Sequence, residues 1–138
     1  MGLRMDLEDA VQETASIIYG EGAPMAGCEL SVKDARAWLN SMEPSRPFCL
    51  VAEWSWLDLD TPDNAQDRSG GARPPAVIYS NYVLFDSRYR FPVGGWVRST
   101  MLVTLREGVI FETRNTRYLL MGPGVRKTTS LSAVGSIR

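Results

Sequence analysis

Residues 96–113 have the sequence WVRSTMLVTLREGVIFET, and this stretch decides the fold that we predict. Both of its ends are rich in β-branched and other apolar residues, which favour pleated strands, and Glu107-Gly108 between them is a short turn. We therefore predict a β-hairpin of two strands, at 96–106 and 109–113. Side chains alternate along a strand, so the strand at 96–106 has two faces, and its arginines lie on only one of them. These faces are Val97, Ser99, Met101, Val103 and Leu105 on one side, and Trp96, Arg98, Thr100, Leu102, Thr104 and Arg106 on the other.

Further strands flank this hairpin in the sequence. AVIYSNYVLFD at 76–86 predicts one or two strands, and RYLLM at 117–121 predicts another. A turn at Arg114 and Asn115 precedes the latter, because Asn tolerates a left-handed backbone. The glycines and proline that open GPGVRKTTSLSAVGSIR at 122–138 break that strand. We expect a short helix or a frayed tail after the break.

The first half of the chain predicts two helices and a strand. Apolar residues recur at helical spacing in 6–19. Ser31 caps a second helix, which Pro44 and Pro47 close. FCLVAEWSW at 48–56 is continuously apolar and aromatic, as expected of a strand at the centre of a sheet. The apolar helix positions are Leu7, Val11, Ala15 and Ile18 in the first helix, and Ala35, Trp38, Leu39 and Met42 in the second.

These elements predict a single α+β domain over residues 1–138, with two N-terminal helices packed on a mostly antiparallel, hairpin-rich sheet of about five strands. Glycine and proline make 21–27 a turn-rich connection, and aspartate, glycine and proline make 58–75 a flexible loop. An exposed edge at 76–86 or at the final strand would pair with a second copy, so we expect a homo-oligomer. No apolar run reaches the length of a membrane span and the opening is acidic, so we expect a cytoplasmic protein that contacts no membrane.

Charge is distributed unevenly along the chain. Residues 1–67 hold thirteen acidic and four basic side chains, whereas 68–138 hold three acidic and eleven basic ones, ten of them arginine. The planar guanidinium of arginine suits phosphate and carboxylate, and aromatic residues are interleaved with the arginines of the second half. Two interpretations stay open: the arginines form a ligand-binding surface, or the two halves neutralise each other within the fold. The first requires guanidinium groups that gather beside aromatic rings without carboxylates to neutralise them.

Several functional classes lack their usual residues. The chain has no histidine, which is the commonest general base and metal ligand. Its two cysteines, Cys28 and Cys49, predict buried thiols rather than a disulfide framework or a zinc site. DLDTPDN at 58–64 is similar to a calcium loop but lacks its glycine and its distal glutamate. We therefore expect no enzyme, no catalytic residues, no metal site and no cofactor. A weaker alternative is a hydrolase or transferase that works without histidine, assisted by a metal on the carboxylates of 58–67.

The GGWVRST stretch at 94–100 and FETRNTRYLLMGPGVRKT at 111–128 resemble a family of small bacterial and prophage proteins that carry a domain of unknown function. The segments at 19–31 and 47–54 are also similar to that family. No activity is known for the family, so the resemblance implies none. It adds the expectation of a role in the conflict between phages and bacterial defences.

Two functions are expected from these residues. The first is a non-enzymatic binding module that holds a phosphate-bearing ligand, a nucleotide or a nucleic acid strand, on an arginine and aromatic surface. GPGVRKT at 122–128 supports it, because glycines let backbone amides approach a phosphate. The predicted ligand-binding residues are Arg98, Arg114, Asn115, Arg117, Tyr118, Arg126 and Lys127. The alternative is a protein-interaction module, an inhibitor or an adaptor, that docks through the acidic helices or the aromatic surface.

Overall fold

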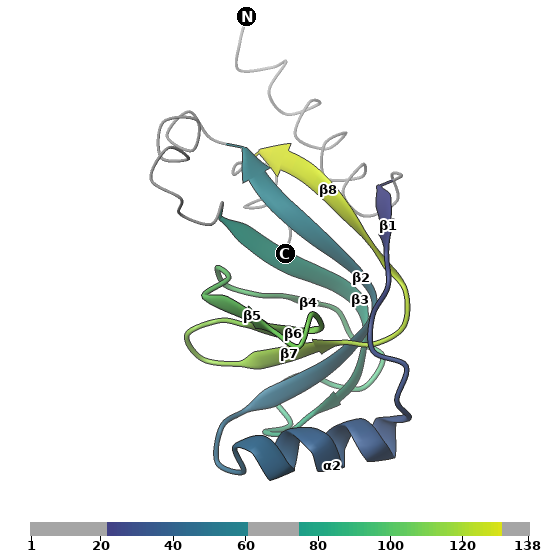
Figure 1. The fold of residues 1–138 in the computed structure, drawn as a ribbon, viewed down its shortest axis with the longest axis vertical. Helices are drawn as coiled ribbons and strands as arrows, with labels where there is room; N and C mark the ends of the chain where they lie inside the picture. Colours follow the sequence, from purple (N-terminus) through teal and green to yellow (C-terminus); the bar gives the residue numbers. More distant parts are fainter. Residues whose placement is uncertain (1–21, 61–74, 131–138) are drawn as a thin grey trace, which may run out of the picture.

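Residues 22–60 and 75–130 are described by the computed structural model of the protein. They form one helix and one eight-stranded mixed sheet, which curls strongly (Figure 1). In chain order the elements are β1 (Ala23–Met25), α2 (Val32–Met42), β2 (Phe48–Asp60), β3 (Ala76–Asp86), β4 (Val97–Arg98), β5 (Thr104–Arg106), β6 (Ile110–Glu112), β7 (Arg117–Leu120) and β8 (Gly124–Ser130). Within these ranges no helix has the length and apolarity needed to span a membrane.

The protein is mostly β, so the predicted α+β class, with two helices on a sheet of about five strands, is wrong. One helix and eight strands occupy the described residues, and the helix predicted at 6–19 lies outside them. Two segments that were predicted to be irregular are strands. The 21–27 connection contains β1, and the region after Gly122 continues as β8 instead of a short helix or a tail. β8 is rich in β-branched Val and Thr, which prefer strands, and its pairing with β2 outweighs the glycines and proline before it.

β2 is the central strand, as its continuous apolar sequence predicted. β3 pairs along one side of it, while β7 and then β8 pair along the other. The strand extends to Asp60, so the start of the loop predicted at 58–75 belongs to it, and 61–74 lie outside the described residues. β3 forms as one strand over 76–86 and pairs with both β2 and β4. β3 is therefore not an exposed edge, and the other expected edge, the final strand β8, pairs with β1 and β2. Oligomerisation stays a prediction.

β2 changes direction at Glu53, whose φ of 49° is left-handed. Side chains switch faces across this residue, so Val51 and Trp54 point into the same core. Pairing changes at the same point, because Val51 is the last residue paired with β7 and Ser55 is the first paired with β8. The indole of Trp54 donates to two carbonyl oxygens of the connection between β7 and β8, both at 3.2 Å, and so spans the gap between those strands.

The sheet curls until two of its strands are joined by the segment between β4 and β5. The N–H of Leu102 donates to the carbonyl of Ala76 in β3 (2.9 Å). The N–H of Val103 donates to the carbonyl of Glu112 in β6 (2.7 Å). One core fills the inside of this curl and contains both tryptophans of β2. A second core lies on the other face of the sheet, beneath α2.

The hairpin of β5 and β6 confirms the turn predicted at Glu107-Gly108. Both residues have positive φ, 53° and 73°, as a type I′ turn requires. The N–H of Val109 donates to the carbonyl of Arg106 at 3.1 Å and closes the turn.

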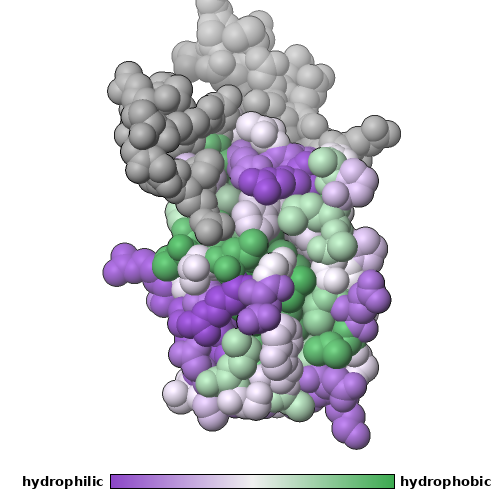
Figure 2. Space-filling view, in the orientation of Figure 1, coloured by the Kyte–Doolittle hydropathy of each residue, from purple (hydrophilic) through white to green (hydrophobic). Residues whose placement is uncertain are grey.

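The strand predicted over 96–106 forms only at its two ends, as β4 and β5. Val97 and Ser99 are buried, as expected of one predicted face. Met101 and Val103 belong to the same predicted face but are 43% and 57% exposed. The alternation fails because this segment leaves β3 and crosses to β6. Figure 2 shows hydrophobic surface at mid-height on the face drawn in Figure 1.

α2 begins and ends where the sequence predicted. Ser31 is its N-cap and accepts a 3.1 Å hydrogen bond from the N–H of Asp34. Ala35 and Leu39 are fully buried in the core between the helix and the sheet. The helix therefore lies across the end of the sheet where β2 starts (Figure 1).

Candidate phosphate-binding site

Three segments meet at one end of the sheet. The 43–47 segment leads into β2, the 87–91 segment follows β3, and the turn at 113–116 joins β6 to β7. Phe48, the first residue of β2, pairs with Arg117 at the start of β7. The carbonyl of Phe48 accepts a 2.9 Å hydrogen bond from the residue that follows β3. We call the surface formed here by Arg46, Arg88, Arg90 and Arg114 the arginine end.

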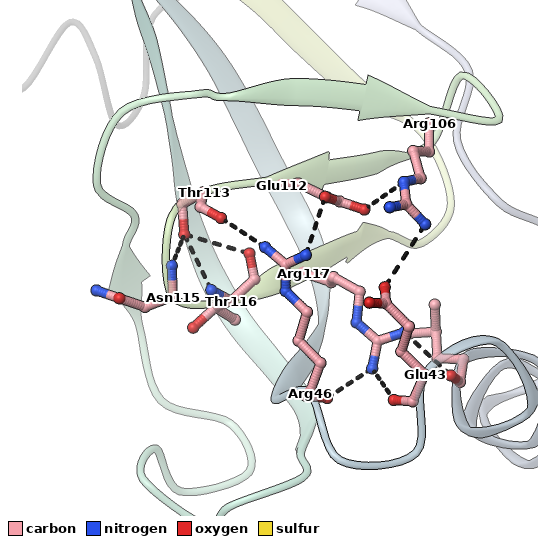
Figure 3. Close-up of polar contacts among 9 residues, drawn as sticks. Glu43, Arg46, Arg106, Glu112, Thr113, Asn115, Thr116 and Arg117 are labelled. Carbon is pink, nitrogen blue, oxygen red and sulfur yellow. Dashed lines mark hydrogen bonds and ion pairs between the residues drawn. The ribbon is translucent and has the colours of Figure 1, made fainter.

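The turn predicted at Arg114 and Asn115 is confirmed, but its expected cause is wrong, because Asn115 is not left-handed. The side chain of Thr113 holds the turn instead (Figure 3). The hydroxyl oxygen of Thr113 accepts hydrogen bonds from the N–H groups of Asn115 (3.4 Å) and Thr116 (3.2 Å). The N–H of Thr113 donates to the carbonyl of Thr116 at 2.9 Å. Arg114 and Asn115 at the tip of this turn are both exposed.

Arg46 links the 43–47 segment to this turn. Its Nη2 donates a 3.0 Å hydrogen bond to the carbonyl of Thr113, and its Nη1 lies 3.4 Å from a carboxylate oxygen of Glu112. Glu112 is buried and also pairs with Nε of Arg106 at 2.8 Å (Figure 3). A longer contact of 3.6 Å joins Arg106 to Glu43. The buried carboxylate of Glu112 thus orients two arginines that both keep part of their side chains in solvent.

Arg90 links the 87–91 segment to the same turn. It binds both carboxylate oxygens of the buried Asp86, with Nη2–Oδ1 at 2.6 Å and Nε–Oδ2 at 2.9 Å, and donates to the hydroxyl of Thr116 at 2.8 Å. Burial by itself raises the pKa of Asp86, but hydrogen bonds from the side chain and backbone of Arg90 outweigh it and hold that pKa below its ordinary value. Hydrogen bonding to Asp86 also raises the pKa of Arg90. The pair is therefore fixed in its charged form.

Arg88 and Arg114 complete the arginine end. Arg88 donates a 2.6 Å hydrogen bond to the carbonyl of Ser45 and stays exposed. The side chain of Arg114 makes no hydrogen bond or ion pair within residues 22–60 and 75–130. The described charged groups at and beneath the arginine end include three more cations than anions. They are Arg46, Arg88, Arg90, Arg106, Arg114 and Arg117, against Glu43, Asp86 and Glu112.

Arg117, one of the predicted ligand-binding residues, lies beneath this surface. It is fully buried, and its guanidinium donates to the carbonyls of Leu39, Glu43 and Arg46. The C-terminal turn of α2 has no basic residue of its own. Arg117 therefore supplies the positive charge that stabilises a helix C-terminus. Burial lowers the pKa of Arg117, although the charge of Glu43 opposes that effect.

Two other predicted residues are buried or already paired. Tyr118 lies in the core inside the curl, and burial raises its pKa to about 12. Arg126 binds both carboxylate oxygens of Asp58 and lies over the ring of Trp56. The β2 partner of Arg126 is eight residues from that of Arg117, a length of about 26 Å along the strand at roughly 3.3 Å per residue.

Arg98 and Lys127 lie in the same distant part of the sheet as Arg126. Arg98 is opposite Tyr79 in β3, and Lys127 is opposite Leu57 in β2. Burial lowers the pKa of Lys127. Of the seven predicted residues, the structure brings together only Arg114, Asn115 and Arg117, at and next to the 113–116 turn. Ligand binding by all seven stays a prediction.

The arginine end contains three residues that the sequence did not single out as a site. Arg46 stands in the acidic half of the chain, between two prolines, so the charge asymmetry gave no signal for it. SRYR at 87–90 did carry a signal, because two arginines flank an aromatic residue directly after a strand. Their meeting with Arg114 depends on the pairing of β2 with β3 and β7, which no local pattern encodes.

A family model matches residues 25–136, which include the whole arginine end. Its description is a domain of unknown function, DUF6957. The chain belongs to the DUF6957 family. The expected membership of a family with a domain of unknown function is thus confirmed, while its bacterial and prophage origin stays a prediction. No curated protein and no solved structure matches the chain.

The arginine end of this DUF6957 domain offers binding chemistry. Guanidinium groups present paired N–H donors that match the oxygens of a phosphate. The nearby thiol of Cys49 is a poor nucleophile, because burial and the charge of Asp86 raise its pKa to about 12. Within the described ranges no three Asp, Glu or Cys side chains are grouped to hold a metal ion.

Proposed function

We propose that the protein is a non-enzymatic binding module that holds a phosphate-bearing ligand, a nucleotide or a nucleic acid strand, on the arginine end. The observation that carries the proposal is the local excess of positive charge, with an exposed Arg114 that has no partner among the described residues. This excess occurs in a chain whose net charge is −1, so it is a local property of the fold.

The geometry of the arginines supports phosphate as the ligand. Arg46 and Arg90 are held by contacts to the protein, yet their side chains remain 29% and 33% exposed. A guanidinium that is already held loses little conformational entropy when it binds, and its outward N–H groups stay available. Arg88 and Arg114 extend the same surface from two further segments, so one ligand would meet cations from three parts of the chain.

We place this function in the cytoplasm of bacteria, in the conflict between phages and their hosts. The bacterial and phage setting rests on the resemblance carried by WVRST at 96–100 and ETRNTRYLLMGPGVRKT at 112–128, and the cytoplasm on the acidic opening and the absence of a long apolar run in the sequence. The arginine end has no bearing on this placement.

Exposed apolar side chains favour a second function, in which the protein binds a protein partner or another copy of itself. Tyr82, Val93 and Trp96 are exposed on and beside the connection between β3 and β4. Aromatic residues are enriched at the centres of protein interfaces. Sedimentation velocity tests the homo-oligomer: the wild type is expected to sediment as a larger species than Trp96→Ala. If the wild type and Trp96→Ala both sediment as monomers, the self-association part of this function is contradicted.

Fluorescence anisotropy with labelled oligonucleotides and a labelled nucleoside triphosphate tests the main proposal. Binding is expected at low salt and is expected to weaken steeply between about 20 and about 200 mM salt, because binding releases counterions. The double variant Arg88→Ala/Arg114→Ala is expected to weaken binding about tenfold and to lower the salt slope by about two.

Lys33→Ala is the matched control, because Lys33 is an exposed cation in the first turn of α2, away from the arginine end. We expect it to change affinity by less than about twofold, since screening limits the effect of a distant charge. Absence of binding to every probe at low salt would overturn the proposal. Equal losses per charge removed in the control and the double variant would show attraction by net charge and would remove the arginine end as the site.

A further inference from the structure

Tyr89 lies between Arg88 and Arg90 in the sequence and has a backbone conformation that is rare for an aromatic residue. Its φ is 56°, in the left-handed region that bulky side chains avoid. The residue is 79% exposed, so burial of its ring does not offset the backbone strain. Strained residues persist where the surrounding structure holds them, and they cluster at binding sites.

The fold orients this exposed ring. The rings of Tyr89 and Phe85 meet edge to face, with centroids 5.7 Å apart and planes at 85°. The guanidinium of Arg36 lies 3.8 Å from the centroid of Phe85 and supports it from α2. The N–H of Tyr89 donates a 3.0 Å hydrogen bond to the carbonyl of Asp86, which fixes the backbone as well. With so little of the residue covered, the contact with Phe85 leaves a face of the Tyr89 ring open to solvent.

Two arginines of the arginine end flank Tyr89 in the sequence, and their side chains reach two different segments. Arg88 reaches the carbonyl of Ser45, and Arg90 reaches the hydroxyl of Thr116. The ring of Tyr89 therefore projects from the loop that lies between the 43–47 segment and the 113–116 turn. Aromatic rings set among cations are the arrangement by which proteins bind unpaired bases and their phosphates together.

We propose that Tyr89 is a stacking platform for an unpaired base, and that the ligand of the arginine end is single-stranded nucleic acid. This inference rests on the proposed function and specifies its ligand. Bases in a duplex are stacked on one another and offer no free face to the ring, whereas every base of a single strand does. A single strand also supplies several phosphates in succession, which suits arginines that come from three segments.

Anisotropy titrations at low salt with four labelled probes test the inference. The probes are a ten-nucleotide dT strand, an abasic strand with the same number of phosphates, a duplex of the same length and a single nucleoside triphosphate. We expect the dT strand to bind roughly tenfold more tightly than the abasic strand, because the charge is equal and only the bases differ. The duplex and the mononucleotide are expected to bind more weakly than the dT strand.

Two variants assign the difference to the ring. Tyr89→Gly removes the ring but suits the left-handed backbone, so it is expected to fold and to bind the dT and abasic strands equally. Tyr89→Phe keeps the ring and is expected to bind as the wild type does. Tyr82→Ala, which removes another exposed tyrosine from β3, is the matched control and is expected to leave the ratio unchanged.

The outcomes separate this inference from the proposed function. Equal binding of dT and abasic strands by the wild type would overturn stacking by Tyr89, while anion binding by the arginine end would stand. Tighter binding of the duplex or of the mononucleotide would overturn the single strand as the ligand. A loss in Tyr89→Phe as large as in Tyr89→Gly would show a role for the hydroxyl and would also overturn stacking. If no probe binds, both proposals fall.

Discussion

The guanidinium of Arg117 donates a 3.0 Å hydrogen bond to the carbonyl oxygen of Leu39, a residue 78 positions earlier in the chain. The same group donates to the carbonyl of Glu43 at 2.9 Å, so a residue of β7 satisfies the backbone at the C-terminal end of α2. Helix C-termini leave carbonyls without partners and favour positive charge. One buried arginine thereby joins the helix to the sheet directly beneath the arginine end.

Removing this arginine is expected to destabilise the protein. Arg117→Met leaves buried carbonyls at the end of α2 without donors, and we expect a loss of about 3 kcal/mol in the free energy of unfolding. Urea denaturation followed by tryptophan fluorescence measures it. Arg114→Met, an exposed neighbour, is the control and is expected to cost less than about 0.5 kcal/mol. Equal midpoints for the two variants would contradict the capping role of Arg117.

Gly124 is expected to tolerate no side chain. A Cβ built there would overlap the indole of Trp54, which is itself fully buried. Gly124→Ala must displace that indole, so we expect a loss of about 2 kcal/mol or more. Gly108→Ala has open space around its Cβ but a φ of 73° and serves as a comparison for backbone strain alone. Thermal unfolding is expected to show the larger decrease in Tm for Gly124→Ala.

The pair of Asp86 and Arg90 predicts a dependence of stability on pH. The folded pKa of Asp86 lies below its ordinary value of 3.8. Its carboxylate therefore stabilises the fold above that ordinary value, and the contribution is lost as the pH falls through the lower folded pKa. Asp86→Asn is expected to cost about 2 kcal/mol at pH 7 and progressively less below about pH 4. Urea midpoints at pH 7 and below about pH 4 measure this cost in stability. Glu29→Gln, which changes an exposed carboxylate, is the control. A cost that stays constant with pH would contradict the charged pair.

Cys49 is expected to be unreactive in the folded protein. It is fully buried, and burial raises its pKa to about 12, so its thiol is protonated at neutral pH. A Cys28→Ser variant isolates this thiol for titration with a chromogenic disulfide. We expect native Cys49 to react roughly 100-fold more slowly than the unfolded chain, because the reagent needs an exposed thiolate. Immediate reaction in the absence of denaturant would contradict its burial.

The elements that the sequence predicted correctly depend on neighbouring residues. Ser31 and Asp34 form the cap of α2 within one turn, and Glu107-Gly108 bends the chain within four residues. The continuous apolar sequence from Phe48 predicted a central strand because both faces of β2 are buried, in two different cores. The turn at Arg114 and Asn115 was likewise predicted from neighbouring residues. These two residues are the part of the candidate site that sequence reasoning found.

The elements that the sequence mispredicted depend on distant pairing. β8 follows a glycine and proline break, yet it forms a strand because Ser55–Asp60 of β2 provides a partner. The alternation predicted for 96–106 reverses at Met101 because the chain crosses there from β3 to β6.

The sequence by itself determined the caps, the turns, the central strand and the excess of arginine in the second half, since each is a property of residues a few positions apart. Only the tertiary structure decided which arginines bind carboxylates and which stay available. Arg126, Arg90 and Arg46 contact the carboxylates of Asp58, Asp86 and Glu112, and Arg117 is buried under α2. The side chains of Arg88 and Arg114 contact no carboxylate of the described residues. The physical reason is that strand register brings together groups that lie far apart in the chain. The register therefore decides which charged side chains have a partner.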